Sequence, residues 1–231
     1  MSNKFRVDPW LTKLLDRPAL YLDCEVSTLQ LSDFPNEKSF ISTKIKTKDS
    51  NNLAKLQSLG FRVVDVNVQF LKNGPIKLET KSLGTVRFAE PKDESIIRKI
   101  ARTSFLYDRF HSDTEISPFI ADNIKEEWVA NFFLGKRGNK MFVIDVNNTV
   151  CGFLLLLDNI KSITIDLIGV TKEYQGKGLS SQMIMVASKL LMNESKNKIL
   201  VGTQLANLPS IRLYTKLGFI FNESFYVLHR H

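Results

Sequence analysis

A short glycine-bearing stretch, VTKEYQGKGLSS at residues 170–181, carries the clearest chemical signal in this sequence. Residues 163–170 before it alternate and are β-branched, while residues 179–192 after it carry apolar side chains at helical spacing. Gly176 and Gly178 therefore occupy a predicted turn from a strand to a helix. Such a turn points free backbone N–H groups and the positive end of a helix dipole at one place. This arrangement predicts anion binding, with phosphate as the expected anion.

Two known phosphate-binding fingerprints are excluded by the residues around this turn. A nucleoside-triphosphate loop requires a glycine five residues before Gly176, where Thr171 stands, and a hydroxyl residue after Lys177, where Gly178 stands. A dinucleotide-binding fingerprint requires a third glycine at the position of Ser181. The turn is therefore predicted to bind the phosphate of another kind of ligand.

Proton transfer would need a base, and two side chains are candidates. Asp166 shares a strand face with Ile168 and Val170, because residues two and four apart on a strand point the same way. His111 lies in a polar loop and titrates near neutral pH. A chain of water molecules that carries the proton to bulk solvent is an equal alternative.

Metal catalysis is not expected from the histidines and cysteines. His229 and His231 lie in a C-terminal segment that we expect to fray, without acids at ligand spacing. The two cysteines, Cys24 and Cys151, lie in apolar strand-like runs and form neither a disulfide framework nor a zinc motif. This cysteine usage favours a reducing, cytoplasmic location.

The composition of the 231 residues, 43% hydrophobic and 24% charged, fits one or two globular domains. The net charge is +8, but the lysines are spread out, so we interpret the charge as a solvated basic surface rather than a nucleic-acid face. The N-terminus lacks the pattern of a signal peptide, and no apolar run approaches the about 20 residues of a membrane span. We expect a protein that is neither secreted nor membrane-spanning.

The pattern of residues 85–231 predicts an α+β domain with a mostly antiparallel sheet and packing helices. Asn147 and Asn148 tolerate the geometry of a tight hairpin, and Gly218 is typical of a helix end. Besides the helix after the glycine turn, the pattern favours helices at 92–105, 118–135 and 208–218 and strands at 85–91, 140–146, 149–158, 161–170, 198–204 and 219–230.

Residues 1–84 are predicted to form a smaller α/β domain, with no assignment for its middle part. Its LQSLGFRVVDVNVQF echoes YTKLGFIFNESFYVL near the other end of the sequence. When the two Leu-Gly-Phe triplets are aligned, Leu56 falls opposite Tyr214 and Asp49 falls opposite Asn207. No second Gln-Gly-Lys-Gly accompanies the first copy, so we interpret this domain as a degenerate half-copy of the other.

The order of elements after residue 85, the VTKEYQGKGL turn and the downstream NLPSIRLYTKLGF together resemble the GCN5-related N-acetyltransferase superfamily. The resemblance implies direct transfer of an acetyl group from acetyl-coenzyme A to an amine in a ternary complex. It also implies that backbone amides of the turn bind the cofactor pyrophosphate. The residues that match this part of the family pattern are Gln175, Gly176, Lys177, Gly178, Leu179 and Ser180.

The same resemblance implies roles for four residues outside the turn. Backbone groups at Ile168 and Val170 would pair with the pantetheine arm of the cofactor. Asn207 would also contact this arm, although it equally suits a helix cap. Tyr214 would act as general acid toward the sulfur of coenzyme A, as a positioned hydrogen-bond donor.

Softer motifs, the YDRFHSD loop, the C-terminal stretch and the half-copy domain, resemble bacterial enzymes that acetylate a nucleotide-linked amino sugar of the dTDP-4-amino-4,6-dideoxyhexose type. This implies a role in surface polysaccharide synthesis, such as that of lipopolysaccharide. Arg109 would then grip the phosphates of the sugar nucleotide, or else form a structural ion pair. The alternatives are a peptide, protein or polyamine acceptor, or a non-catalytic acyl-coenzyme A sensor. We expect no nucleic-acid partner, and an open final strand through which a homodimer would form.

Overall fold

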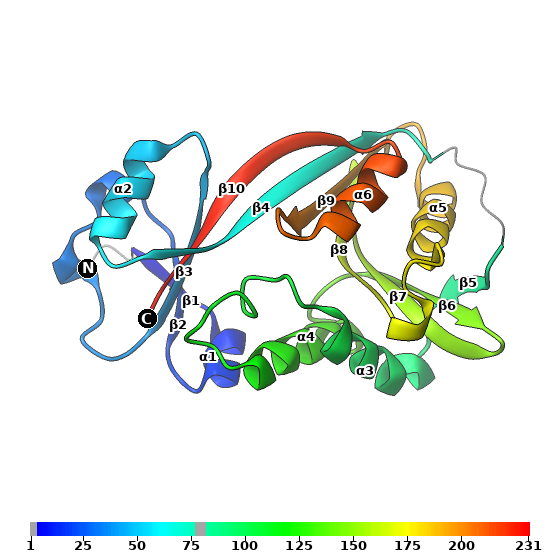
Figure 1. Cartoon of the computed structure of the whole chain (residues 1–231), viewed down its shortest axis with the longest axis horizontal. Helices are drawn as coiled ribbons and strands as arrows, with labels where there is room; N and C mark the ends of the chain where they lie inside the picture. The colour runs from blue at the N-terminus through cyan, green and yellow to red at the C-terminus, as the bar shows by residue number, and fades with distance from the viewer. Residues whose placement is uncertain (1–3, 77–81) are drawn as a thin grey trace.

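The computed structural model describes residues 4–76 and 82–231, which form one ten-stranded sheet and six α-helices (Figure 1). The strands are β1 Phe5–Val7, β2 Ala19–Leu22, β3 Phe40–Lys46, β4 Arg62–Asn73, β5 Thr85–Phe88, β6 Lys140–Val146, β7 Thr149–Asp158, β8 Ser162–Val170, β9 Lys198–Gln204 and β10 Ile220–Arg230. The helices are α1 Pro9–Leu15, α2 Ser50–Ser58, α3 Glu94–Ser104, α4 Pro118–Phe133, α5 Leu179–Leu191 and α6 Leu208–Lys216.

The sheet has the strand order β1-β2-β3-β10-β4-β9-β8-β7-β6-β5. Two of its neighbouring pairs, β2 with β3 and β8 with β9, are parallel, and the others are antiparallel. The mostly antiparallel α+β fold is therefore confirmed. The expectation of an open final strand is wrong, because β10 lies between β3 and β4 and the sheet edges are β1 and β5.

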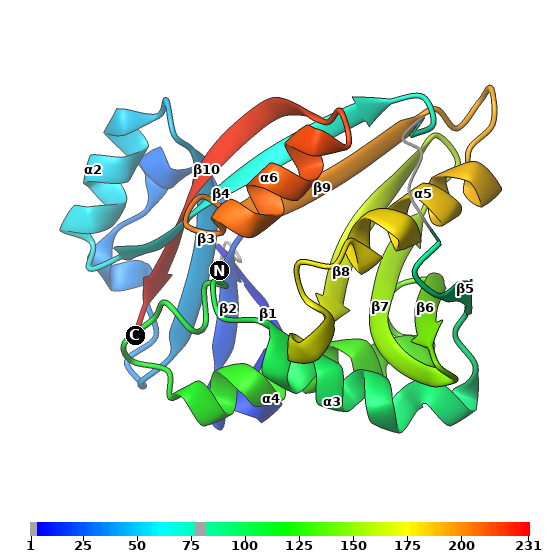
Figure 2. The same cartoon turned by 45° about the vertical axis from the view of Figure 1, so that its right-hand side comes forward.

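Helices cover both faces of the second half of the sheet (Figure 2). Leu154 and Leu156 of β7 belong to the core with α5 and α6, while Phe153 and Leu155 belong to the core with α3 and α4. Since neighbouring residues on a strand point to opposite faces, α5 and α6 lie on one face and α3 and α4 on the other. This double coverage explains why β7 is apolar at nearly every position.

The two echoing stretches form two copies of one strand–helix–strand unit, β3-α2-β4 and β9-α6-β10. The carboxylate of Asp49 caps the N-terminus of α2, and the amide of Asn207 caps α6. Each unit then turns at a glycine in the left-handed region, Gly60 with φ 88° and Gly218 with φ 78°. The strand pairing follows the same correspondence between the copies. The last strand of each copy pairs with the first strand of the other, β10 with β3 and β4 with β9, and the two last strands, β4 and β10, pair with each other.

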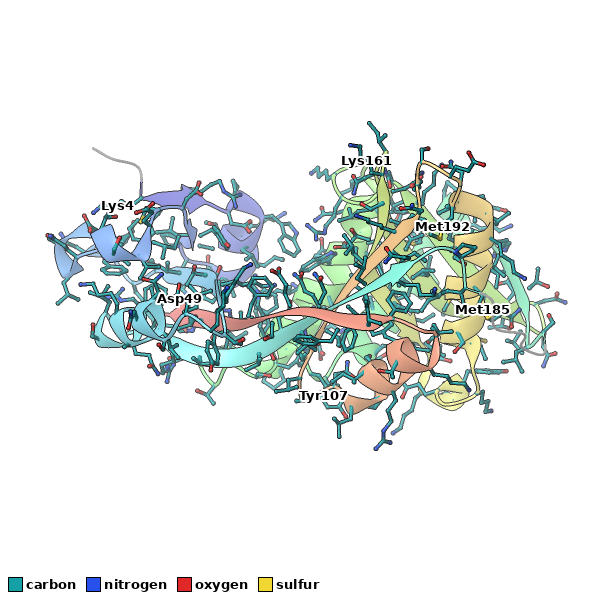
Figure 3. All side chains as sticks on the ribbon, turned by 90° about the horizontal axis from the view of Figure 1, so that it is seen from above. Lys4, Asp49, Tyr107, Lys161, Met185 and Met192 are labelled. Atoms are coloured by element: carbon teal, nitrogen blue, oxygen red, sulfur yellow. The ribbon has the colours of Figure 1, made fainter. Side chains whose placement is uncertain are left out.

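The first copy therefore repeats part of the second, and its interpretation as a degenerate half-domain stays a prediction. Figure 3 shows Asp49, at the start of α2, at the opposite end of the molecule from Met185 of α5. The first copy has its own core, which includes Leu20, Ile41 and Leu56. The predicted domain boundary at residue 84 stays a prediction, and the two predicted domains share one sheet because β4 lies between β9 and β10.

Strand β1, helix α1 and strand β3 in the first 50 residues were not predicted. Helix α1 begins at Pro9 after Asp8, whose side chain accepts a hydrogen bond from the Leu11 amide at 3.0 Å. These are ordinary start signals, but the helix has only seven residues and little periodicity. Strand β3 lies in the part left without assignment. None of the helices in the described ranges is long and apolar enough to cross a bilayer.

Candidate active site

Strands β8 and β9 run side by side and then separate. Their parallel pairing joins Ser162–Ile165 to Lys198–Val201 and stops there. Beyond this point β8 continues to Val170 with β7 as its partner, and β9 continues to Gln204 with β4 as its partner. Figure 2 shows the two strands diverging. The separation leaves an open strand edge in the middle of the sheet, where backbone groups can pair with a ligand.

The predicted positions Ile168 and Val170 face this open edge. The Thr171 amide donates to the Cys151 carbonyl of β7 at 2.8 Å, so Thr171 belongs to a hydrogen-bonded antiparallel pair. Because such pairs alternate with non-bonded pairs, the backbone groups of Val170 and Ile168 point away from β7. The Val170 carbonyl accepts from the Gln175 side-chain amide at 3.1 Å and from the Ser104 hydroxyl at 3.3 Å. The Val170 amide and the Ile168 backbone groups are then the ones that remain for a ligand.

The glycine turn follows directly and ends at the first residue of α5. Gly176 and Gly178 have φ of 75° and 92°, so both occupy the left-handed region that favours glycine. Gly178 is the N-cap of α5 and has no side chain to satisfy the first turn of the helix. No backbone acceptor within the described residues is found for the amides of Leu179 and Ser180. Together with the helix dipole they form a site for a phosphate.

Two side chains of the turn complete this site. The Gln175 side chain ties the turn back to the end of β8, through the bond to the Val170 carbonyl. The Lys177 ammonium lies 4.9 Å from the centre of the Tyr174 ring, and its residue is exposed to solvent. The six predicted turn residues therefore lie together beside the open edge of β8, where their roles toward the cofactor remain predictions.

Tyr214 lies on α6, packed between the rings of Phe70 and Phe219. Its side chain is 2% exposed, and burial raises the pKa of its phenol. Among the described residues the hydroxyl has no hydrogen-bond partner. The phenol is therefore protonated at any physiological pH and available to donate to a ligand atom, as the predicted role of general acid requires.

Asn207 connects β9 to α6. Its side-chain oxygen accepts from the Ser210 amide at 3.1 Å, which makes it the N-cap of α6. The capping role, one of the two alternatives, is thus observed. The side-chain nitrogen remains available, so contact with the cofactor arm stays a prediction.

Asp166 lies on the β8 segment beyond the separation, but its carboxylate is fully engaged. It accepts from the Arg137 guanidinium at 2.6 and 2.8 Å and from the Trp128 indole at 2.8 Å. Its side chain is 7% exposed. To act as a base, Asp166 would have to give up three strong donors, so this geometry favours a structural role.

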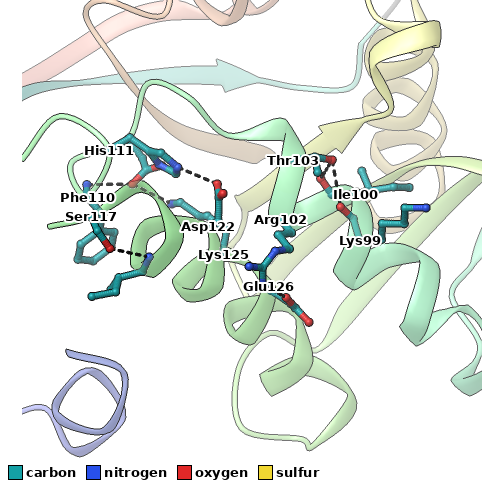
Figure 4. Close-up of polar contacts among 12 residues, drawn as sticks. Lys99, Ile100, Arg102, Thr103, Phe110, His111, Ser117, Asp122, Lys125 and Glu126 are labelled. Carbon is teal, nitrogen blue, oxygen red and sulfur yellow. Dashed lines mark hydrogen bonds and ion pairs between the residues drawn. The ribbon is translucent and has the colours of Figure 1, made fainter. Parts of the chain in front are cut away.

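His111 lies between two carboxylates in the loop before α4 (Figure 4). Its Nδ1 lies 2.5 Å from Asp108 and its Nε2 lies 3.0 Å from Asp122. The hydrogen bond with Asp108 is the main cause of a raised pKa for this imidazole. The geometry therefore favours the imidazolium form, which has no free nitrogen to accept a proton.

Arg109, the predicted phosphate ligand, has no ion-pair partner within the described part of the chain. Its guanidinium lies 4.4 Å from the Phe110 ring centre and 3.5 Å from Nε2 of His229. Burial lowers its pKa, which indicates an incompletely solvated cation. The alternative of a structural ion pair is not observed.

The expectation that His229 and His231 would fray is wrong. The Asp113 carboxylate accepts from Nδ1 of His229 at 2.6 Å and from Nε2 of His231 at 2.8 Å, and all three side chains are buried. Their ligand atoms lie within 4.8 Å of one another, as in a metal site. However, the cations of Arg17 and Arg109 face the other ring nitrogens, at 2.7 and 3.5 Å. Because these charges repel a metal ion, the cluster fits a structural role.

Asp65 and Lys44 are candidate functional residues that the sequence reading missed. Burial raises the pKa of Asp65 on β4 to about 6. The signal was an acidic residue between the valines of FRVVDVNVQF. It becomes informative only when the neighbouring strands are known. Lys44 lies on β3, a strand that the sequence pattern does not predict, and its ammonium interacts with Asp65.

Comparison with known proteins agrees with this geometry. Residues 100–219 match the model of the family described as Acetyltransferase (GNAT) family. The spore coat polysaccharide biosynthesis protein SpsD of Bacillus subtilis (strain 168) is 30% identical over 140 residues, which cover 61% of this chain and 48% of that protein. This chain thus spans about half the length of that curated relative.

Two solved structures have the same fold. The GCN5-related N-acetyltransferase from Sphaerobacter thermophilus superposes with a TM-score of 0.63 at 12% identity, over 92% of this chain and 72% of that chain. The GCN5-related N-acetyltransferase from Kribbella flavida superposes with a TM-score of 0.60 at 11% identity, over 92% of this chain and 81% of that chain.

Proposed function

The chain belongs to the acetyltransferase (GNAT) family, and from this premise we propose that it transfers the acetyl group of acetyl-coenzyme A to the amine of a nucleotide-linked amino sugar. The family membership makes it an N-acetyltransferase. The acceptor that we propose is of the dTDP-4-amino-4,6-dideoxyhexose type, and the product would serve surface polysaccharide synthesis.

The observation that carries the proposal is the open edge of β8 next to the glycine turn. An extended chain with two amides, such as pantetheine, can pair with the Ile168 and Val170 backbone along this edge. The turn at Gly176 and Gly178 then meets the pyrophosphate at the other end of the same ligand. The strand edge and the anion site are continuous, so together they suit coenzyme A, in which an arm with two amides is joined to a pyrophosphate.

Tyr214 supplies the acid for the leaving sulfur. Its protonated hydroxyl, which has no hydrogen-bond partner in the described part of the chain, can donate to the thiolate as negative charge develops there. The amine attacks directly, since neither free cysteine belongs to the turn or to the open edge: Cys151 is buried on β7, and Cys24 follows β2.

Two observations support the amino-sugar acceptor. The curated relative is named for polysaccharide biosynthesis, and it matches this chain over only part of either protein. Arg109, a cation without an ion-pair partner within the described ranges, suits an acceptor that carries phosphates.

The test is mass spectrometry of mixtures of acetyl-coenzyme A with a panel of nucleotide-linked amino sugars, peptide amines and polyamines. We expect one acetyl group to be added to a 4-amino-4,6-dideoxyhexose nucleotide, more slowly by Tyr214→Phe. Acetylation of peptides or polyamines alone would contradict the acceptor class and keep the reaction. Binding of acetyl-coenzyme A without transfer to any amine would support the sensor alternative.

A further inference from the structure

Asp65 lies on β4, and only β9 stands between β4 and β8 in the sheet. Asp65 is two residues before Asn67, which pairs with Gln204 at the end of β9. The Gln204 side chain is one of the groups that favour the charged form of the Asp65 carboxylate. A Cβ atom on Gly202 would meet the Asn67 side chain at 3.3 Å, so Gly202 and Asn67 share a face. By alternation Asp65 and Gln204 lie on that face too. Gln204 therefore brings Asp65 to the place where β9 has already left β8.

Asp65 and Tyr214 lie on opposite faces of the sheet. Val68 and Phe70 of β4 belong to the core that contains Tyr214, and Asp65 occupies the alternate positions of the same strand. Because the sheet is open between β8 and β9, a ligand held in this opening can be reached from both faces of the sheet. An acid on one side and a carboxylate on the other suit an amine that attacks a thioester held in the opening.

Some of the charged side chains around Asp65 form ion pairs, and others do not. Those that interact with it are Lys44 from β3 and Asp108 and Arg109 from the loop before α4. Asp108 is already shared by Lys125, at 3.8 Å, and by His111. Within the described ranges neither Asp65, Lys44 nor Arg109 forms an ion pair, so one carboxylate and two cations remain for a ligand. That ligand would carry both a positive group and an anionic group.

We propose that Asp65 accepts the proton of the acceptor ammonium, and that Lys44 and Arg109 bind the phosphates of the same acceptor. This inference rests on the proposed function, and it assigns residues to the acceptor side of the reaction. A nucleotide-linked amino sugar has the required charges, an ammonium on the sugar and a diphosphate beyond it. A simple polyamine would be repelled by the two cations.

The proton balance of the step involves both faces of the sheet. An N–H bond of the ammonium breaks, and Asp65 takes this proton. The neutral nitrogen forms a bond to the thioester carbon, and the bond from that carbon to sulfur breaks. Tyr214 gives its proton to the sulfur and takes up the second proton that the nitrogen loses. The products are the amide, the thiol and one proton, which Asp65 releases to solvent.

The electrostatics of the site support this assignment. Burial, as the main cause, raises the pKa of Asp65 to about 6, which suits a base that works near neutral pH. The charge of Lys44 opposes this rise, and that of Asp108 adds to it. The charges of Lys44 and Arg109 also favour the neutral form of a bound amine.

The test is the pH dependence of kcat/KM with dTDP-4-amino-4,6-dideoxygalactose as the probe. We expect Asp65→Asn to lower kcat/KM by about 10²–10⁴-fold and to abolish an acidic limb near pH 6. The matched control is Glu223→Gln on β10, the counterpart of Asp65 in the second copy, which pairs with Lys46 at 2.6 Å. This variant is expected to keep both the rate and the limb.

A second variant tests the anion site separately. Arg109→Gln is expected to raise KM for the probe by at least about tenfold and to leave the Kd of acetyl-coenzyme A unchanged. Transfer by the unmodified protein together with an intact acidic limb in Asp65→Asn would overturn the assignment of Asp65 alone. If the unmodified protein acetylates no nucleotide-linked amino sugar, the acceptor assignment falls together with the proposed function.

Discussion

The substitution Asp65→Asn is expected to stabilise the folded protein at neutral pH while it impairs transfer. Burial moves the pKa of Asp65 from an ordinary 3.8 to about 6, so keeping it ionised in the folded state costs free energy. About two pKa units correspond to a ceiling of about 3 kcal/mol. Asp65 is partly exposed, and solvent screening reduces this to about 1–1.5 kcal/mol. At about 2–4 °C per kcal/mol for a chain of this size, Tm rises by about 2–6 °C.

The pH dependence of this gain distinguishes it from an improvement in packing. Asp65 is protonated in the folded protein below about pH 6, but in the unfolded chain only below about pH 4. The cost is therefore fully present above pH 6, falls between pH 6 and pH 4 and disappears below. Thermal unfolding of Asp65→Asn, the unmodified protein and Glu223→Gln at pH 7.5 and pH 4.5 measures it. An equal Tm difference at both pH values, or a lower Tm at pH 7.5, would refute the reasoning.

Three further substitutions test other parts of the structure. Gly178→Ala forces a side chain into a φ of 92° and is expected to weaken acetyl-coenzyme A binding about tenfold, as measured by calorimetry. Gly135→Ala, at a left-handed position with open space around it, is the control and should leave binding unchanged. Equal losses of affinity in the two variants would contradict the phosphate site. Tyr214→Phe is expected to slow single-turnover transfer about 10–100-fold with unchanged cofactor affinity, and an unaltered rate would remove its role as acid. Asp113→Asn should lower the free energy of unfolding in urea by about 3 kcal/mol at pH 7. Because the hydrogen bonds from His229 and His231 hold the pKa of Asp113 low, the difference from the unmodified protein should shrink as the pH falls below about 4. A difference that stays constant with pH would contradict this role of Asp113.

Features set by local backbone geometry were the ones that the sequence predicted well. The hairpin at Asn147 and Asn148 has φ of 51° and 61°, and Gly218 ends α6 in the left-handed region. The glycine turn likewise joins a strand to a helix as predicted. In each case one or two residue types determine the conformation of a few neighbouring bonds, so no knowledge of distant residues is needed.

Features that depend on distant parts of the chain were not predictable in the same way. Asp65, Lys44 and Arg109 meet because β3 and β4 lie in one sheet and the loop before α4 lies against its face. The sequence pattern does not predict the ordered position of His229, because its partner Asp113 lies far away in the sequence. The pattern of a single sequence indicates which segments form helices and which form strands, but not the order in which the strands pair.

The position of β4 has a consequence for synthesis. This strand, with twelve residues, pairs with β9 on one side and β10 on the other, and the ribosome makes both long after β4. During translation both edges of β4 therefore lack their final partners, and its apolar residues stay uncovered until the second copy emerges. The protein is thus expected to complete its sheet only late in translation, and fragments that stop before β9 are expected to aggregate rather than fold as a first domain.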